Sequence, residues 1–350
     1  QTTNLGVRGS NPFGRAIFFP YRKLLRFDAR FLFLLPSGGR FLFPEKCPWC
    51  LLLPRFFYWG PREVMGKREK PEGKCLLLGT RRKFARSHII PKFLTNKALG
   101  GTARIQFGIN GYPQLLFNSW WDETIVGEEG ERRLRDIDTA AAQLFRSLGI
   151  SWSNFPLSPH AVRAQMGDAE VELISIPDCD TETLRLFFLS LLWRSAVSSR
   201  FEFAGITLDQ ESLETLRRFV LGIEQPSTAD FPCVLLLLTT RGEPQIFTPA
   251  TEIIDMEQLG FTLPNIPIFR FFLDGLIVHM GRKLGDVELA ESWGRRIVGS
   301  SRDLILLGRP YEGSAQEENI ETLKEALFRD YPEQAAKIYR TLDRHVQRGK

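Results

Sequence analysis

The pentapeptide Ser87-His88-Ile89-Ile90-Pro91 carries the clearest chemical signal in this sequence. A histidine at the end of a strand, followed by two apolar residues and a proline that turns the chain, has its imidazole held in a fixed direction. Hydrolysis of a phosphodiester needs a base that takes a proton from water and a divalent cation that stabilises charge on the leaving oxygen. The motif therefore makes His88 a candidate general base. The alternative is a structural histidine among apolar neighbours.

The elements that must position this histidine are predicted on either side of it. The run Cys75-Leu76-Leu77-Leu78-Gly79 is short, apolar and closed by glycine, which favours a strand and a turn. Residues 100–118 are rich in glycine and asparagine, as expected of loops or a hairpin. Residues 129–148 are predicted as a helix that Gly149 ends. Its apolar residues recur on one face at Leu134, Ile137, Ala141, Leu144, Phe145 and Leu148.

The stretch Cys75–Leu94, read with Asp122–Phe145, resembles a zinc-containing branch of the HNH endonuclease superfamily. In that branch a C-x-x-C pair precedes S-H-I-I-P, and a second pair in C-x-x-C-E or C-x-x-C-N leads into a helix. Here Lys92-Phe93-Leu94 continues the histidine motif in the same way, and residues 125–131 lead into the predicted helix. The segment Phe187–Ser199 is also similar to a family segment, "FLLSILWRASVSS". The resemblance covers roughly residues 70–240.

The resemblance implies an α+β fold in which a small ββα-type histidine module precedes a mixed helical and antiparallel-β region. We expect the module at residues 65–150 and the larger domain at 151–350. The implied activity is metal-dependent hydrolysis of nucleic acid, with His88 as general base and Mg²⁺ or Mn²⁺ as cofactor. The alternative is a catalytically dead, nuclease-derived protein that binds nucleic acid or regulates another protein.

The sequence departs from the family pattern at the expected zinc ligands. Cys75 is present, but Leu78 replaces its partner, and Gly127 and Gly130 replace the second pair. A structural zinc normally needs four ligands, so Cys75 is a vestigial position and the zinc is expected to be lost. Glu131 stands where related nucleases often carry a metal-holding asparagine. A carboxylate also binds Mg²⁺, so Glu131 is the candidate metal ligand.

Other residues admit both a functional and a structural interpretation. The acidic pairs Glu128-Glu129 and Asp136/Asp138 are candidate metal carboxylates, but they also complement a helix N-terminus. Trp120-Trp121 is able to stack on bases or to fill a core. His279 falls in a predicted hairpin strand and is interpreted as a packed or half-exposed histidine.

Charge is distributed unevenly along the 350 residues. Residues 1–64 hold ten Lys and Arg and three acids, whereas the remainder holds 36 basic and 38 acidic residues. Nucleic-acid binding by the remainder must therefore use a local basic patch. The candidate contacts are Arg81, Arg82, Lys83 and Arg86.

Residues 1–64 lack sustained periodicity and contain no methionine. Gly9–Pro12 and Ala16–Phe19 can be back-translated into the T-arm and 3′ end of a tRNA gene. We expect residues 1–64 to be translated upstream sequence and the native product to begin near Met65; the alternative is a genuine basic arm. Five cysteines in a chain of this length do not make a disulfide framework. The most apolar run, Leu186–Trp193, is too short for a bilayer. The sequence therefore predicts a cytoplasmic protein without a membrane partner.

The C-terminal region is predicted from local signals. Residues 181–199 and 213–221 are predicted as helices, and residues 231–238 and 303–307 as strands. Asp274-Gly275, between apolar runs at 268–273 and 276–280, predicts a type I′ hairpin. Ser314 and Glu317 predict a capping box at the start of the first of two final helices, and Pro332 is placed in the first turn of the second.

Overall fold

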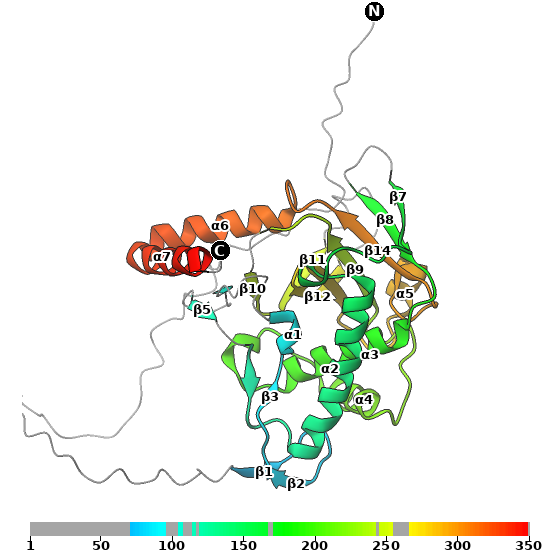
Figure 1. Ribbon diagram of the computed structural model, residues 1–350. Helices are drawn as coiled ribbons and strands as arrows, with labels where there is room; N and C mark the ends of the chain where they lie inside the picture. The colour runs from blue at the N-terminus through cyan, green and yellow to red at the C-terminus, as the bar shows by residue number, and fades with distance from the viewer. Residues whose placement is uncertain are drawn as a thin grey trace, which may run out of the picture. The chain divides into compact units, whose positions relative to one another are not determined.

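Seven strands form one mixed sheet, around which the helices are arranged in this computed structural model (Figure 1). The structure describes residues 71–95, 104–107, 114–116, 119–166, 171–242, 245–254 and 266–348, which all belong to one compact unit. The predicted translated segment, residues 1–64, lies outside the described residues.

The sheet has the strand order β11-β12-β13-β9-β14-β8-β7. Its strands are β7 (Val162–Gln165), β8 (Glu172–Ile176), β9 (Cys233–Leu238), β11 (Ala250–Ile254), β12 (Ile266–Leu273), β13 (Leu276–Gly281) and β14 (Leu304–Arg309). All neighbours are antiparallel except β14 and β9. The expected antiparallel region is thus mixed. The chain between β9 and β14 contains strands β11 to β13 and helix α5 (Val287–Trp293). It returns the chain to the end of the sheet at which β9 begins, so that β14 runs parallel to β9.

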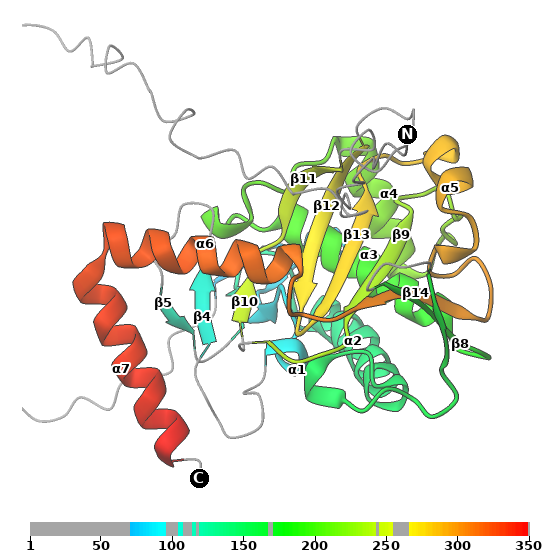
Figure 2. The same cartoon turned by 90° about the horizontal axis from the view of Figure 1, so that it is seen from above.

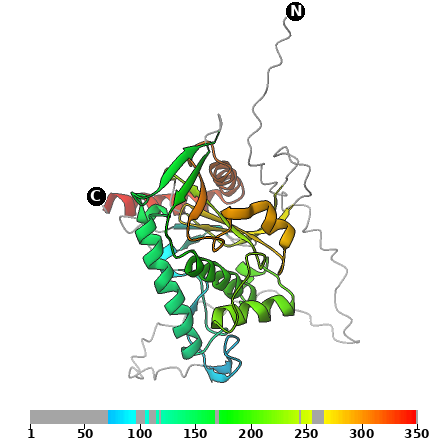
Figure 3. The same cartoon turned by 90° about the vertical axis from the view of Figure 1, so that its right-hand side faces the viewer.

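The two faces of the sheet pack against different helices. Helices α2 (Glu128–Leu148) and α4 (Gln210–Leu221) both contact α3 (Thr181–Val197). The main core joins these helices to Leu235 and Leu237 of β9, whereas Leu236 and Leu238 join a second cluster on the opposite face. This alternation explains the continuous apolar run of β9. Figure 3 shows α3 and α4 on one side of the sheet and α6 (Ala315–Asp330) on the other.

Three smaller sheets are formed by the other strands of the described residues, and one of them contains the histidine motif. They consist of β1 (Glu72–Lys74) with β2 (Arg81–Lys83), β3 (Ser87–His88) with β6 (Trp121–Asp122), and β10 (Gln245–Phe247), β4 (Arg104–Phe107) and β5 (Gln114–Leu116). The predicted strand in residues 75–79 is wrong, because this run forms the turn between β1 and β2 and Gly79 has φ 74°. The antiparallel pairing of β4 with β5 confirms the hairpin within 100–118, whose other residues are not described. The short helix α1 (Lys92–Thr95) follows the histidine motif.

The hairpin of β12 and β13 turns at Asp274 and Gly275, whose φ angles of 55° and 87° confirm the predicted type I′ turn. The 3-10 helix η2 (Trp152–Asn154) docks on this turn. The backbone N–H of Trp152 donates to the Asp274 carbonyl at 2.8 Å, and its indole Nε1 donates to the Leu238 carbonyl at 2.9 Å. A Cβ atom on Gly275 would lie 2.3 Å from the same indole nitrogen, so the contact requires glycine.

The chain ends in the helical hairpin of α6 and α7 (Pro332–Arg348), seen in Figure 2. Ser314 caps α6, as predicted, by accepting the N–H of Glu317 at 3.2 Å. The Glu317 carboxylate accepts the N–H of Gly313, because the N–H of Ser314 is already bonded to the Tyr311 carbonyl. Among the described residues, no helix has the length and apolar character needed to cross a membrane.

Candidate functional site

The strands β3 and β6 form a short antiparallel ribbon around the histidine motif. Ser87 is paired with Asp122, and His88 with Trp121. Residues opposite each other across such a pair face the same side. Ser87 and Asp122 are buried, whereas His88 and Trp121 are half-buried. The ribbon therefore turns Ser87 and Asp122 toward the core, and His88 and Trp121 toward its other side.

The environment of His88 keeps its imidazole neutral. Burial lowers the pKa of His88, the cation Lys92 lowers it further, and the carboxylate of Asp138 opposes the shift in part. A neutral imidazole has a nitrogen that is free to accept a proton. His88 therefore meets the protonation requirement of a general base at neutral pH.

An exposed arginine and a tryptophan lie beside His88. The guanidinium of Arg86 stacks on the ring of Trp121, 3.8 Å from its centroid, and its Nε donates to Glu123 at 3.2 Å. Arg86 precedes His88 by two residues, so the strand period places both on one face. More than half of the Arg86 side chain is exposed (57%). This face thus presents a cation and an aromatic ring next to the imidazole.

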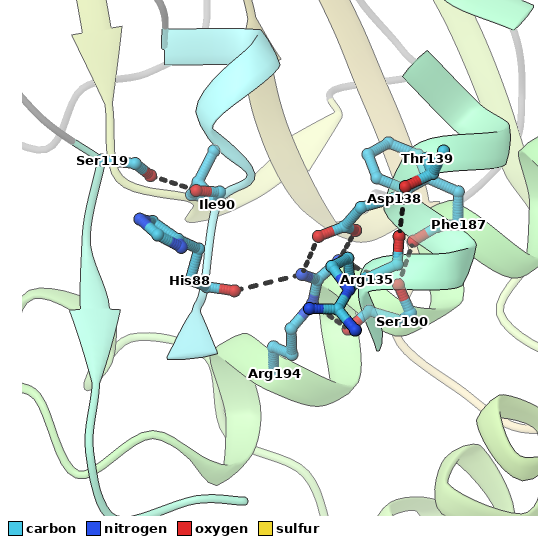
Figure 4. Close-up of polar contacts among 9 residues, drawn as sticks. All are labelled: His88, Ile90, Ser119, Arg135, Asp138, Thr139, Phe187, Ser190 and Arg194. Carbon is cyan, nitrogen blue, oxygen red and sulfur yellow. Dashed lines mark hydrogen bonds and ion pairs between the residues drawn. The ribbon is translucent and has the colours of Figure 1, made fainter. Parts of the chain in front are cut away.

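On the core side, a buried arginine connects α3, α2 and β3. The Arg194 side chain is 0% exposed, and its two Nη atoms donate to the Asp138 carboxylate at 3.0 and 2.8 Å. Nη1 also donates to the His88 carbonyl at 3.1 Å, while Nε and Nη2 donate to the carbonyl and hydroxyl of Ser190. These five bonds match the five N–H donors of a guanidinium. Figure 4 shows the His88 carbonyl directed toward Arg194 and its ring directed away.

The segment that follows Arg194 holds β6 in the same manner. Ser198 donates to the Asp122 carboxylate at 2.9 Å, and Arg200 donates to the Trp121 carbonyl at 3.1 Å. Burial raises the pKa of Asp122, but the hydrogen bonds from Thr124 and Ser198 outweigh it and lower the pKa overall. Sequence reasoning singled out this segment only as a similarity. The available signal was an arginine in an otherwise apolar helix, which requires a buried partner.

Glu131 lies on the Ser87 side of the ribbon. Burial raises the pKa of Glu131, and the nearby hydroxyl of Ser87 and the cation of Arg194 lower it in part. The Glu131 Oε2 and the Ser87 Oγ are both buried without a hydrogen bond of regular geometry. The structure thus brings Glu131 to Ser87 and places the imidazole of His88 on the opposite face.

Cys75 is buried beside the start of α2, against Gly130, one of the two glycines that replace the second cysteine pair. A Cβ atom on Gly130 would lie 3.1 Å from the Cys75 Sγ. The N–H of Leu78 donates to the same sulfur at 3.4 Å. Leu76 and Ala85 donate backbone bonds of 2.8 and 2.9 Å to the carbonyls of residues 125 and 126. Backbone bonds and apolar packing therefore join the two segments without a ligand from Gly127 or Gly130.

The predicted basic contacts occupy the outer hairpin. Arg81, Arg82 and Lys83 form β2, and all three are exposed. Lys74 pairs with Arg81 across the hairpin, and the Arg82 side chain covers Gly127. Arg86 follows on the way into β3. The structure therefore presents every predicted contact residue at the surface of the same chain segment.

A divalent cation fits these residues poorly. Both carboxylate oxygens of Asp138 are held by Arg194, so that only Ser87 and Glu131 offer further oxygen atoms. The buried guanidinium would also repel a second cation placed next to it. In the part of the chain that the structure describes, no three His, Cys, Asp or Glu side chains gather as metal ligands. The cation implied by the resemblance therefore lacks a complete ligand set here.

Comparison of the chain with models of known protein families, with curated protein sequences and with solved structures finds no match in any of the three.

Proposed function

We propose that the protein is a nuclease-derived nucleic-acid-binding protein that does not depend on metal-assisted cleavage. The order of β3, β6 and α2 supports its relation to the ββα module of HNH nucleases, since a strand that ends in His88 is followed by a second strand and a helix. The observation that carries the proposal is the saturated guanidinium of Arg194, bonded to Asp138 beneath His88.

We expect no metal-dependent cleavage because Arg194 already binds both carboxylate oxygens of Asp138. A nuclease of this type needs carboxylate or imidazole ligands that are free to hold a cation against the scissile phosphate. Here a side chain of the protein supplies the positive charge, and it neutralises Asp138 permanently. Burial raises the pKa of Glu131 and so favours its neutral form, which is a weaker metal ligand.

Nucleic-acid binding is supported by the opposite face of the ribbon. Arg86 and Trp121 combine a phosphate-binding cation with a ring on which a base stacks, and they flank the half-buried His88. The exposed hairpin residues Arg81, Arg82 and Lys83 extend the positive surface along the chain. The combination of an aromatic ring and cations favours a single-stranded ligand, whose bases are free to stack.

Cleavage with His88 as general base is the second candidate. It is favoured by the lowered pKa of His88 and by the unmatched oxygens of Ser87 and Glu131, which face each other beside α2. Loss of a general base typically reduces a rate by about 10²–10⁴. This candidate therefore requires the parent protein to cleave nucleic acid at a clearly higher rate than His88→Ala does.

Fluorescence anisotropy with single-stranded RNA, single-stranded DNA and duplex DNA tests the binding proposal. Arg86→Gln and Trp121→Leu are compared with the parent, and Arg302→Gln is the control, since Arg302 is an exposed arginine in an exposed ion pair with Asp178. We expect Arg86→Gln to weaken binding and to reduce the salt slope by about one. Trp121→Leu should weaken binding at every salt concentration, by about 1–3 kcal/mol for one stacked base.

The same samples are incubated with Mg²⁺ or Mn²⁺ to test for cleavage. Binding without cleavage supports the proposal. Cleavage that His88→Ala removes establishes the second candidate instead. Equal weakening in Arg86→Gln and Arg302→Gln would contradict the binding face, because binding would then depend on charge alone.

A further inference from the structure

A second polar site lies on the sheet face opposite to α3, where a cavity of about 80 Å³ lies between the sheet and the first turn of α6 and opens to solvent. Leu236, Leu238 and Ile277 form its apolar wall. Its polar lining consists of Glu252, Arg270, His279, Arg309, Ser314, Gln316 and Asn319. The cavity belongs to neither the ribbon nor the basic hairpin described above.

The strand register explains how the polar residues gather. Arg270 and His279 are directly paired across β12 and β13, so both side chains point to the same face. Glu252 reaches the same face from β11, and its carboxylate lies 3.6 Å from the Arg270 guanidinium. Arg309 ends β14 and donates to the Gly313 carbonyl at 2.9 Å. Three strands and the start of α6 therefore converge on one small volume.

The lining is rich in hydrogen-bond donors. Arg270 donates to the side-chain oxygen of Gln316, which leaves the NH₂ group of Gln316 at the cavity wall. The amide N–H groups of Ala315 and Gln316 are in the first turn of α6, where helix geometry provides no acceptor. The helix dipole adds partial positive charge at this end. Glu252 is the one carboxylate among the lining residues.

We propose that this cavity binds hydrogen phosphate, held by Arg270, His279 and the first turn of α6. The volume suffices for about two to three water molecules, which is enough for a tetrahedral oxyanion and too little for a nucleoside. Glu252 gives the site its selectivity, because a carboxylate accepts a hydrogen bond from a protonated phosphate oxygen. Sulfate is fully deprotonated at neutral pH, so Glu252 repels it.

His279 suits this role. Burial and the neighbouring Arg270 lower the pKa of His279 to about 3, so its ring is neutral and offers one N–H donor. In the described residues the ring has no hydrogen-bond partner of its own. An oxyanion in the cavity would accept this N–H.

Isothermal titration of the full-length protein with inorganic phosphate and with sulfate tests the proposal. Arg270→Gln removes a donor, and Asn319→Leu fills the cavity from α6 without removing the ion pair. Arg340→Gln, an exposed arginine on α7, is the matched control. Circular dichroism verifies that each variant is folded, and Asn319→Leu remains informative if Arg270→Gln is not.

We expect phosphate to bind with one site per chain and to be weakened about tenfold or more by Arg270→Gln and Asn319→Leu. Arg340→Gln should leave binding unchanged. Sulfate should bind about tenfold more weakly than phosphate, and Glu252→Gln should remove this difference. Absence of phosphate binding, or equal losses in the Arg340→Gln control, would overturn the proposal.

Discussion

Arg194 and Arg270 both lie away from bulk water, but their donors are used in different ways. Arg194 has an acceptor for each of its five N–H groups, and these acceptors come from α2, α3 and β3. Arg270 shares a cavity with Arg309, the start of α6 and a single carboxylate. A buried guanidinium with all donors matched fixes the fold. An arginine beside an open volume, next to the first-turn N–H groups of a helix, is suited to an anion.

The largest difference between the two sites is expected in stability. Arg194→Met leaves the Asp138 carboxylate, 20% exposed, without its partner and should lower the free energy of unfolding by about 3–5 kcal/mol. Arg270→Met should cost about 1–3 kcal/mol, because water in the cavity can solvate Glu252. Urea denaturation followed by circular dichroism measures both. Equal losses of unfolding free energy in the two variants would contradict the distinction between Arg194, whose donors are all matched, and Arg270, which lies beside a cavity.

His279, which lines the cavity, should make the stability of the protein depend on pH. The folded pKa of His279, about 3, lies below its ordinary value of 6.5, so the unfolded chain takes up a proton that the folded chain does not. The resulting stability is complete above pH 6.5 and is lost as the pH falls toward 3, by at most about 1.4 kcal/mol per pH unit. His279→Gln should flatten the curve in this window. Unfolding free energies measured across it for both proteins provide the test, and parallel curves would contradict the assignment.

The smallest effect is expected at Cys75, where packing replaces ligation. EDTA should leave the unfolding midpoint unchanged, since Gly130, which lies against Cys75, offers no side-chain ligand. Cys75→Ser should cost about 1 kcal/mol, because a hydroxyl enters an apolar environment. One zinc per chain in elemental analysis, lost in Cys75→Ser, would show that a knuckle survives.

Local signals in the sequence predicted the elements well where one segment determines its own structure. The predicted helix at 129–148 is α2 at 128–148, and Gly149 ends it in the left-handed conformation. The Asp274-Gly275 turn and the Ser314 cap were also confirmed. Each depends on residues that are close in sequence, so periodicity and turn chemistry were sufficient.

The arrangement of the candidate site was not predictable in this way. Arg194 meets Asp138 across 56 residues and His88 across 106, and no local pattern encodes either contact. Residues 75–79 have the composition of a strand, but burial against the start of α2 makes them a turn. The predicted roles of His88, Glu131 and the basic residues in nucleic-acid chemistry stay predictions. What the fold adds is that His88 and Glu131 face opposite sides of β3.

The docking of Trp152 on the Asp274 turn also has a consequence for the order of folding. Ser153 reaches the Asp274 carboxylate across 121 residues, so the contact can form only after the β12–β13 hairpin exists to receive it. Closing so long a loop is entropically costly, and such contacts tend to form after the rate-limiting step. Trp152→Leu, which removes the docking indole without touching the turn, should therefore mainly accelerate unfolding and leave the folding rate nearly unchanged in stopped-flow experiments. The hairpin therefore forms first, and residues 152–154, which precede it in the sequence, dock on it later in folding.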